Sequence, residues 1–313
     1  MSQRLLLVSP VRNEQAHIEC VAEAVAAQTR PPDTWLLVDD GSTDDTRAIL
    51  ERLSLEIPFV RVLDTSALTP VGAVKDRLAT AAEARAFNLA LTQIPWREFT
   101  HVAKLDGDIE LPRRYFEVLL GRFASDPSLG LAGGMYADPD GRGGWKLIEI
   151  PSAYHVPGAL KCYSTSCLQA IDGIREQLAW DTIDESYARM RGFATRSYAD
   201  LLVRHHRPWG SADGTLRGRA RHGRCAYLAH FTLPWVALRS LKVARNRPRG
   251  LSGAAFLCGY LNAAVRREAR VEDPDFRRFV RRELRGRLLG TLRRGPAGTR
   301  SHQGAAVSRL SSQ

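Results

Sequence analysis

Two acidic residues in the segment LDGD have a spacing that could bind a divalent cation. Asp106 and Asp108 lie two positions apart, and Gly107 between them permits the backbone to bend so that both carboxylates face one ion. Oxygen ligands of this kind suit Mg²⁺ or Mn²⁺, which complete their coordination with water and substrate phosphates. Taken alone, Asp-Gly-Asp is more often a simple turn, because Asp and Gly favour turns. A metal site for a diphosphate and a plain turn are therefore the two interpretations.

A second acidic segment, VDDGSTDDT at 38–46, places four carboxylates directly behind an apolar run. Ser42 and Asp45 have the spacing of a capping box, which predicts that a helix begins directly after Ser42. The acids that follow Ser42 would then stabilise the positive end of that helix. The first two carboxylates, those of Asp39 and Asp40, are left to face a ligand.

Both acidic segments follow strands in a chain where strands and helices alternate. Apolar periodicity predicts strands at 4–11, 34–40, 59–64, 101–106 and 130–136, and helices at 14–28, 43–53, 79–92 and 113–124. Such alternation implies parallel pairing and a doubly wound α/β sheet, in which ligands bind beyond the carboxyl ends of the strands. We therefore expect the acidic segments to line that edge of the sheet.

Four segments, in this order and spacing, resemble family 2 glycosyltransferases. They are SPVRNE at 9–14, VDDGSTDDT at 38–46, ARAFNLAL at 84–91 and KLDGDIELP at 104–112. The resemblance is strongest over residues 4–136 and weakens toward residue 210. It implies the GT-A fold, with a Rossmann-like, mostly parallel sheet, and transfer of a hexosyl or N-acetylhexosaminyl group from a nucleotide-diphosphate donor with inversion of configuration. A UDP-sugar is the favoured donor.

The resemblance also assigns residues to the nucleotide. Asp40 is expected to bind the nucleobase, since a carboxylate can accept the N3–H of uracil, and Asp39 to serve the ribose or orient the turn. Arg12 stands where an aromatic residue is common in the family. The turn after the first strand is expected to frame the base, and its candidate residues are Pro10, Arg12, Asn13 and Glu14.

For the metal, the resemblance makes Asp108 the expected ligand of Mn²⁺ or Mg²⁺, with Asp106 contacting the ribose or sharing the ion. Lys104 and Arg85 are cations that could approach the diphosphate. A solvated or structural role explains each of these two cations equally well, because most Lys and Arg carry no function.

The acceptor side offers three candidates for a catalytic base. An inverting enzyme of this family uses an acid near a helix start to remove the proton of the acceptor hydroxyl. In the segment WDTIDE that acid is Asp184, Asp181 or Glu185. Asp184 is favoured, because it is predicted to open the helix DESYARMRG. The alternative is that these acids only cap a helix.

A loop predicted at 203–214 concentrates His205, His206, Arg207 and Trp209. It could close over a diphosphate or hold a metal, or it could be an ordinary polar surface loop. The sequence lacks the Gln-x-x-Arg-Trp element of processive polysaccharide synthases. Single-sugar, non-processive transfer is therefore expected.

The C-terminal part of the chain is strongly basic. The 45 Lys and Arg exceed the 34 Asp and Glu, and the excess lies in residues 239–313. Apolar helices flanked by cations fit the headgroup region of an anionic membrane, although packing on the catalytic domain is the alternative. Residues 215–290 are therefore predicted to form a basic, membrane-associating helical region, suited to a lipid-linked or cell-surface glycan acceptor, and residues 291–313 a disordered tail.

The predicted organisation is a GT-A domain at 1–214, with a nucleotide-sugar half at 1–136 and an acceptor half at 137–214. The first apolar run is too short for a secretory signal, and no run is long enough to span a bilayer. A cytoplasmic location at the inner face of the cell membrane is therefore expected.

Three rival classes were weighed against this prediction. A nucleic-acid-binding protein would explain the basic region, but acids at the strand ends would repel a polyanion, so no nucleic-acid partner is expected. A nicotinamide dehydrogenase would need Gly-x-Gly-x-x-Gly after the first strand, where SPVRNE stands. A phosphoacceptor receiver domain is much shorter than this chain. A non-catalytic role in binding nucleic acid or anionic membrane through the basic region is the remaining alternative.

Overall fold

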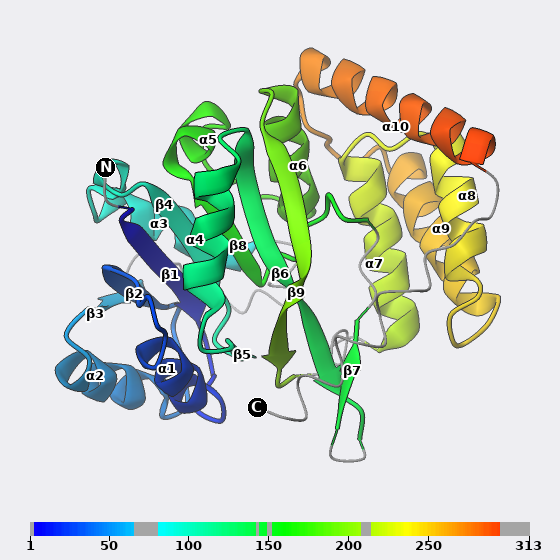
Figure 1. Ribbon diagram of the computed structural model, residues 1–313. Helices are drawn as coiled ribbons and strands as arrows, with labels where there is room; N and C mark the ends of the chain where they lie inside the picture. The colour runs from blue at the N-terminus through cyan, green and yellow to red at the C-terminus, as the bar shows by residue number, and fades with distance from the viewer. Residues whose placement is uncertain (1–2, 66–80, 142–143, 149–151, 208–213, 295–313) are drawn as a thin grey trace. The chain divides into compact units, whose positions relative to one another are not determined.

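The structure is a computed structural model that describes residues 3–65, 81–141, 144–148, 152–207 and 214–294 (Figure 1). The described chain divides into two compact units, 3–207 and 214–294. Parts of three sequence predictions lie outside the described residues: the helix start at 79–80, residues 208–213 of the loop, which include Trp209, and the tail at 295–313.

A nine-stranded sheet forms the frame of the first unit. Its strands are β1 (Leu5–Val11), β2 (Thr34–Asp39), β3 (Val60–Asp64), β4 (His101–Leu105), β5 (Ile109–Glu110), β6 (Leu129–Pro139), β7 (Trp145–Leu147), β8 (Leu160–Ser164) and β9 (Ala194–His205). The order is β3-β2-β1-β4-β8-β6-β9-β5, with β7 paired to β6. The strands β3, β2, β1 and β4 are mutually parallel, and β6 is parallel to β9. Antiparallel pairs join β8 to β4 and β6, β7 to β6, and β5 to β9.

Helices follow the strands of the first unit, so the predicted doubly wound α/β class is confirmed. They are α1 (Ile18–Ala26), α2 (Thr46–Glu56), α3 (Ala82–Thr92), the 3₁₀ turn η1 (Trp96–Glu98), α4 (Tyr115–Ser125), α5 (Thr165–Ala170) and α6 (Trp180–Met190). The apolar stripe predicted for the first helix is buried, as its periodicity requires. Its members are Ile18, Val21, Ala22 and Val25.

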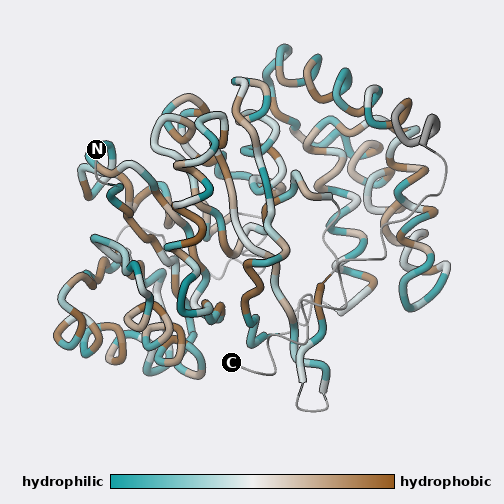
Figure 2. Tube along the Cα trace, in the orientation of Figure 1, coloured by the Kyte–Doolittle hydropathy of each residue, from teal (hydrophilic) through white to brown (hydrophobic). Residues whose placement is uncertain are grey.

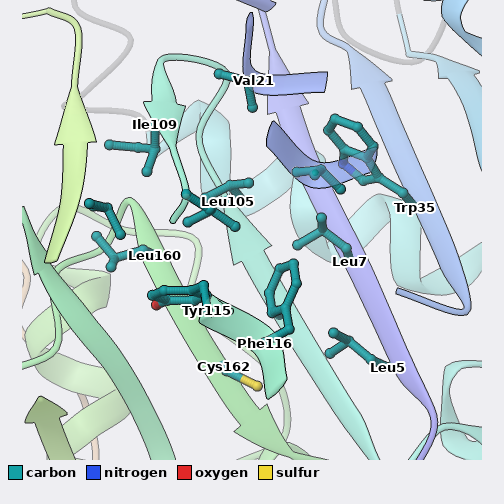
Figure 3. Close-up of a cluster of buried hydrophobic side chains, with 14 of the residues drawn as sticks. Leu5, Leu7, Val21, Trp35, Leu105, Ile109, Tyr115, Phe116, Leu160 and Cys162 are labelled. Carbon is teal, nitrogen blue, oxygen red and sulfur yellow. The ribbon is translucent and has the colours of Figure 1, made fainter. Parts of the chain in front are cut away.

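The core of the first unit lies between the parallel strands and the helices α1 and α4. Leu5 and Leu7 of β1 and Trp35 of β2 meet Tyr115 and Phe116 of α4 in one buried cluster (Figure 3). These strands are buried along almost their whole length, because a sheet covered on both faces needs apolar residues at successive positions. A rigid, parallel set of strands therefore carries the acidic segments at its carboxyl edge.

Three of the differences from the predicted boundaries affect residues of the candidate site. Helix α2 begins at Thr46, not at residue 43, because Ser42 accepts a hydrogen bond from the backbone of Asn13 and caps no helix. Helix α6 begins at Trp180, which places Asp184 in its second turn and not at its start. The predicted loop at 203–214 begins as the end of β9.

The second unit is helical, with α7 (Thr215–Leu228), α8 (Leu233–Val243), α9 (Leu251–Val265) and α10 (Pro274–Arg294). The backbones of α7 and α9 approach closely at two glycines. A Cβ on Gly223 would lie 1.8 Å from the carbonyl oxygen of Phe256, and one on Gly259 would lie 1.9 Å from that of Ala220. Hydrophobic and hydrophilic residues recur along α10 (Figure 2). None of the described helices combines the length and apolar character needed to cross a membrane.

Candidate functional site

Asp39 ends β2 and Asp40 begins the turn that follows it, and both are almost fully buried. The Asp39 carboxylate accepts a hydrogen bond from the backbone N–H of Ser42 at 3.0 Å and lies 3.6 Å from the Arg47 guanidinium. The backbone N–H of Asp40 donates to the carbonyl of Val11 on β1. Asp39 therefore shapes the turn, one of the two roles that the sequence left open for it.

The turn after β1 is tied to the turn after β2. Arg12 Nη1 donates to the backbone oxygen of Asp40 at 2.9 Å. Asn13, at a φ of 54°, accepts from the backbone N–H of Thr43 at 2.8 Å and donates its own backbone N–H to the Ser42 hydroxyl. Two segments about thirty residues apart in sequence thus form one surface, as expected where parallel strands end together.

Two further residues that the sequence predicts to contact the donor lie on regular elements. Pro10 lies inside β1, where its Cα pairs with that of Val38. Arg85 is exposed on α3.

Asp106 directly follows β4 and is bound by a buried lysine. Lys104 Nζ forms an ion pair with Asp106 Oδ1 and donates to Glu83 Oε2 and to the carbonyl of Gly158, each at 3.1 Å. The Lys104 side chain is fully buried, whereas that of Asp106 is 30% exposed. Of the two roles weighed for Lys104, these contacts favour the structural one, and they leave part of the Asp106 carboxylate accessible.

Burial raises the pKa of Asp106 to about 6; the ammonium of Lys104 opposes this shift, and the charges of Glu83 and Asp108 add to it. The pKa of Lys104 is raised despite its burial, because Asp106 and Glu83 stabilise the ammonium form. The ion pair is therefore charged at neutral pH.

Asp108 lies at the centre of a second charged group. His205 Nε2 is 3.6 Å from Asp108 Oδ2, and its Nδ1 is 2.8 Å from Asp138 Oδ1. Arg207 donates to Glu14 Oε2 at 2.6 Å and lies 3.9 Å from Asp108. The chain thus places two cations against the acid that the sequence predicts to bind a metal.

The charges of this group shift its pKa values in opposite directions. Despite burial, Asp108 and Asp138 raise the pKa of His205 to about 9. Burial raises the pKa of Glu14 to about 7, and the charge of Asp108 adds to this shift. The pKa of Asp108 is lowered despite burial, because His205 and Arg207 stabilise its carboxylate. Asp108 is therefore ionised at neutral pH.

The donor set at these positions fits a hard divalent cation only in part. Among the described residues, no group of three or more His, Cys, Asp and Glu is arranged to hold a metal ion. Asp106 and Asp108 supply carboxylates, and Mg²⁺ and Mn²⁺ commonly use one or two carboxylates with phosphate and water oxygens completing the shell. The residues therefore suit an ion that arrives with a diphosphate.

The three candidate bases lie in different environments on α6. Asp184 is fully buried and accepts from Lys161 Nζ at 2.7 Å and 2.9 Å and from the Tyr163 hydroxyl. Glu185 is also buried and accepts from the backbone N–H of Val156 at 2.7 Å. Asp181, in the first turn, is partly exposed, and its carboxylate makes no hydrogen bond or ion pair with any residue in the described ranges.

Neighbouring charges and burial shift the pKa values of Asp184 and Glu185, the two buried acids of α6. Burial raises the pKa of Asp184 to about 6, opposed by Lys161 and reinforced by the charge of Glu185. The pKa of Glu185 is lowered to about 2 despite burial, because His155 and Lys161 stabilise its carboxylate. Both carboxylates are committed to a buried network, whereas Asp181 is available to a ligand.

Sequence reasoning missed several members of these groups. Glu83, Asp138, Lys161 and Trp180 were not singled out, and the only available signal was a charged residue inside an apolar strand, as in LKCYS at 160–164. The structure brings the predicted residues together as three groups, one in the joined turns after β1 and β2, one around Asp106 and Asp108, and one in the first two turns of α6.

The sequence matches the model of one protein family. The model of the family described as "Glycosyl transferase family 2" matches residues 7–166, slightly more than half of the chain. That span contains the acidic segments after β2 and β4 and ends before α6. No curated protein matches the chain in sequence.

Solved structures show likeness in fold. TarS of S. aureus aligns with a TM-score of 0.51 and 15% identity over 83% of this chain, which spans 43% of TarS. A TarS structure in complex with UDP-GlcNAc gives 0.52 and 15%, over 83% of this chain and 72% of that one. A mannosyltransferase from Pyrobaculum calidifontis, in complex with GDP-Man and Mn²⁺, gives 0.55 and 16%, over 100% of this chain and 79% of that one.

Proposed function

This chain belongs to glycosyl transferase family 2, and on that premise we propose that it is an inverting, metal-dependent glycosyltransferase acting on a nucleotide-sugar donor. Its fold is the GT-A fold of the solved relatives. The observation that carries the proposal is the placement of Asp40 and Asp106 directly after β2 and β4. Both strands are parallel to β1, so their ends meet at one edge of the sheet, where this architecture binds ligands.

On the donor side, each acid is given a separate task. Asp40 accepts from the nucleobase, framed by Arg12 and Asn13. Mn²⁺ or Mg²⁺, held by Asp106 and Asp108, would supply positive charge to the donor diphosphate. UDP-GlcNAc and GDP-Man are bound by the solved relatives, and a UDP-sugar remains the favoured donor here, with a hexosyl or N-acetylhexosaminyl group to be transferred.

On the acceptor side, we assign the base to Asp181 in place of Asp184. A general base must reach the hydroxyl whose proton it removes. Asp184 is fully buried against Lys161 and Tyr163, whereas Asp181 is partly exposed at the first turn of α6. Asp181 would take the proton of the acceptor hydroxyl as that oxygen attacks the anomeric carbon and the nucleoside diphosphate leaves.

The test of this function is calorimetric binding of UDP, GDP and dTDP, each with Mn²⁺, Mg²⁺ or a chelator. We expect one nucleotide to bind with a micromolar Kd in the presence of metal and to bind far more weakly with chelator. The nucleotide that binds names the donor class. A folded protein that binds none of the three under any condition would contradict the proposal.

A second proposal concerns the helical unit and follows from the exposed face of α9. Successive exposed apolar residues of this helix are three and four positions apart and so share one face. They are Leu251, Ala254, Cys258, Leu261 and Val265. The opposite face is buried, with Gly253 against α8 and Gly259 against α7. The exposed apolar stripe therefore has no covering element among the described residues.

Exposed cations lie at both ends of this stripe. Arg247 and Arg249 precede α9, Arg266 and Arg267 follow it, and all four are exposed. A further row of exposed arginines lies on α10, at Arg277, Arg278, Arg281, Arg282 and Arg285. An apolar stripe bordered by cations fits a helix lying in the plane of an anionic headgroup layer. We propose a peripheral contact with the inner face of the cell membrane, where a lipid-linked glycan acceptor would be available.

The double substitution Leu261→Ser with Val265→Ser is expected to weaken binding to anionic vesicles by about tenfold or more. The reason is that burial of one such side chain contributes about 1.5–3 kcal/mol, and about 1.4 kcal/mol is a factor of ten in affinity. Co-sedimentation with phosphatidylserine-containing vesicles measures the effect. The matched control is Leu55→Ser, which changes a leucine that is 88% exposed on α2.

Binding to purely zwitterionic vesicles should be much weaker, because the cations around α9 then lose their attraction to lipid headgroups. Equal binding of the double variant and the wild type to anionic vesicles would contradict the assignment to α9. Failure of the wild type to bind any vesicle would leave packing or another partner to explain the stripe.

A further inference from the structure

Two fully buried lysines lie side by side behind the candidate site. Lys104 of β4 and Lys161 of β8 are paired in register across an antiparallel ladder. Like charges at paired positions of neighbouring strands repel each other, and burial raises the cost of each charge. Two buried ammonium groups at these positions therefore need anionic or hydrogen-bonding partners, and these partners belong to the candidate site.

Each lysine binds a different functional segment. Lys104 pairs with Asp106 on the donor side. Lys161 Nζ donates to the backbone oxygen of Asp181 at 2.5 Å and to the carboxylate of Asp184 at 2.7 Å, so it holds the first turn of α6 from below. Lys104 therefore holds Asp106, the acid assigned to the metal and diphosphate. Lys161 holds the backbone of Asp181, the proposed base.

Trp180 connects the two lysines. The Nζ atoms of Lys104 and Lys161 each lie 5.3 Å from the centroid of its ring. Its Nε1 donates to Glu83 Oε1 at 3.0 Å, and the other oxygen of Glu83 accepts from Lys104. Trp180 directly precedes Asp181, so a single buried aromatic ring touches the cation networks of both segments.

The segment directly before β8, Gly158 and Ala159, contacts residues on both sides of this cluster. The carbonyl of Gly158 accepts from Lys104, and a Cβ on this glycine would lie 3.2 Å from Trp180 Cζ2 and 3.4 Å from Asp181 Cβ. The next carbonyl, that of Ala159, accepts from the backbone N–H of Asp106 at 2.9 Å. Contacts thus run without interruption from Asp106 to Asp181.

We propose that Lys104, Trp180 and Lys161 are positioning residues that fix Asp106 and Asp181 relative to each other. This inference rests on the proposed function, since it assigns Asp106 to the metal–diphosphate and Asp181 to the acceptor hydroxyl. A cluster serving stability alone has no need of ion pairs, because buried ion pairs are often no more stabilising than apolar residues of similar volume. Catalysis, in contrast, depends on holding the reacting groups at a fixed separation.

The two lysines should have separable effects. Lys104→Met frees the Asp106 carboxylate and should weaken metal-dependent nucleotide binding. Lys161→Met frees the first turn of α6 and should lower turnover while nucleotide affinity stays unchanged. Misplacement of a catalytic group by about 1 Å can cost about a hundredfold in rate, so we expect a loss of about ten- to a hundredfold in kcat for Lys161→Met.

The experiment combines turnover, binding and hydrogen exchange. Turnover is the release of UDP from UDP-GlcNAc or of GDP from GDP-mannose, and binding is calorimetry of UDP and GDP with Mn²⁺. We expect Lys104→Met to raise the nucleotide Kd by about tenfold, on the scale of lost support to a metal ligand. We expect Lys161→Met to lower kcat with Kd within about twofold of the wild type, since the donor contacts are intact.

Four further variants, one of them a control, separate positioning from stability. Lys161→Met combined with Asp184→Asn removes both charges of the buried pair, so it should recover the melting temperature but not kcat. Trp180→Phe keeps an aromatic face beside the two lysines but loses the hydrogen bond from Nε1 to Glu83, so its kcat and nucleotide affinity should fall less than those of Trp180→Leu, which loses both kinds of contact. Arg52→Met, which removes exposed ion pairs with Glu19 and Glu56, is the control for losing a cation.

Hydrogen exchange provides a readout that does not need activity. Faster amide exchange at 179–184 is expected for Lys161→Met, and at 106–110 for Lys104→Met. If the two lysine variants lower kcat and affinity in the same proportion, or leave both unchanged while folded, the positioning role is wrong. A wild type that binds neither nucleotide would instead overturn the proposed function and this inference with it.

Discussion

Substitution of Asp181 by Asn is expected to lower turnover by about 10²–10⁴-fold while leaving nucleotide affinity and melting temperature close to those of the wild type. An amide of the same shape cannot remove a proton from an acceptor hydroxyl. The Asp181 carboxylate makes no hydrogen bond or ion pair within the described part of the chain, so its loss removes no stabilising contact there. Release of nucleoside diphosphate from the donor measures turnover, and calorimetry measures binding.

The matched comparison is Asp184→Asn, three positions further along the same helix. Because the ammonium of Lys161 would lose a buried partner, this change is expected to destabilise the protein by about 3–5 kcal/mol, seen as a lower melting temperature. The two variants should therefore separate chemistry from folding. Full turnover in Asp181→Asn would exclude this residue as the base and return the assignment to the buried pair.

Asp108→Asn is expected to weaken nucleotide binding in the presence of Mn²⁺ by about a hundredfold or more, since even changes next to a metal ligand cost about 10- to 100-fold. The amide loses the charge that binds a divalent ion and leaves His205 and Arg207 without their shared anion. Calorimetry with the nucleotide that the wild type prefers, with and without chelator, measures the effect.

Asp45→Asn is the control for Asp108→Asn. Asp45 lies in the other acidic segment, is exposed, and makes no side-chain cap to α2. We expect its nucleotide affinity to equal that of the wild type. If the wild type binds a nucleotide as tightly with chelator as with Mn²⁺, the metal has no part in donor binding, and His205 and Arg207 become the candidates for neutralising the diphosphate.

The donor side of the site was predictable from the sequence because its position follows from strand order alone. An apolar run followed by acids marks the carboxyl end of a buried strand, and parallel strands bring such ends together. Asp40 and Asp106 are placed by this rule, through the register of β1 with β2 and with β4. The pairing of Asp106 with Asp108 can be predicted from their spacing in sequence alone, without tertiary information.

The acceptor side was not predictable in the same way. Three acids within five residues look alike in sequence. Asp184 differs from Asp181 because its buried carboxylate accepts a hydrogen bond from Lys161, which lies more than twenty positions earlier, on β8. The sequence predicts a loop at the end of β9 because Pro and Gly bound the polar segment VRHHRPWGSADG. The pairing of β9 with β6 carries two irregularities in register, which local periodicity does not reveal.

Helix α9 presents two faces that are constrained by different partners. Its inner face approaches the backbones of α7 and α8 so closely that glycine is required, whereas the apolar residues of its outer face are exposed. Effects of substitutions on the two faces should therefore add independently. An engineer could make the outer face polar to obtain a protein that crystallises or stays monodisperse without lipid, and could do so while the packing of the helical unit is preserved.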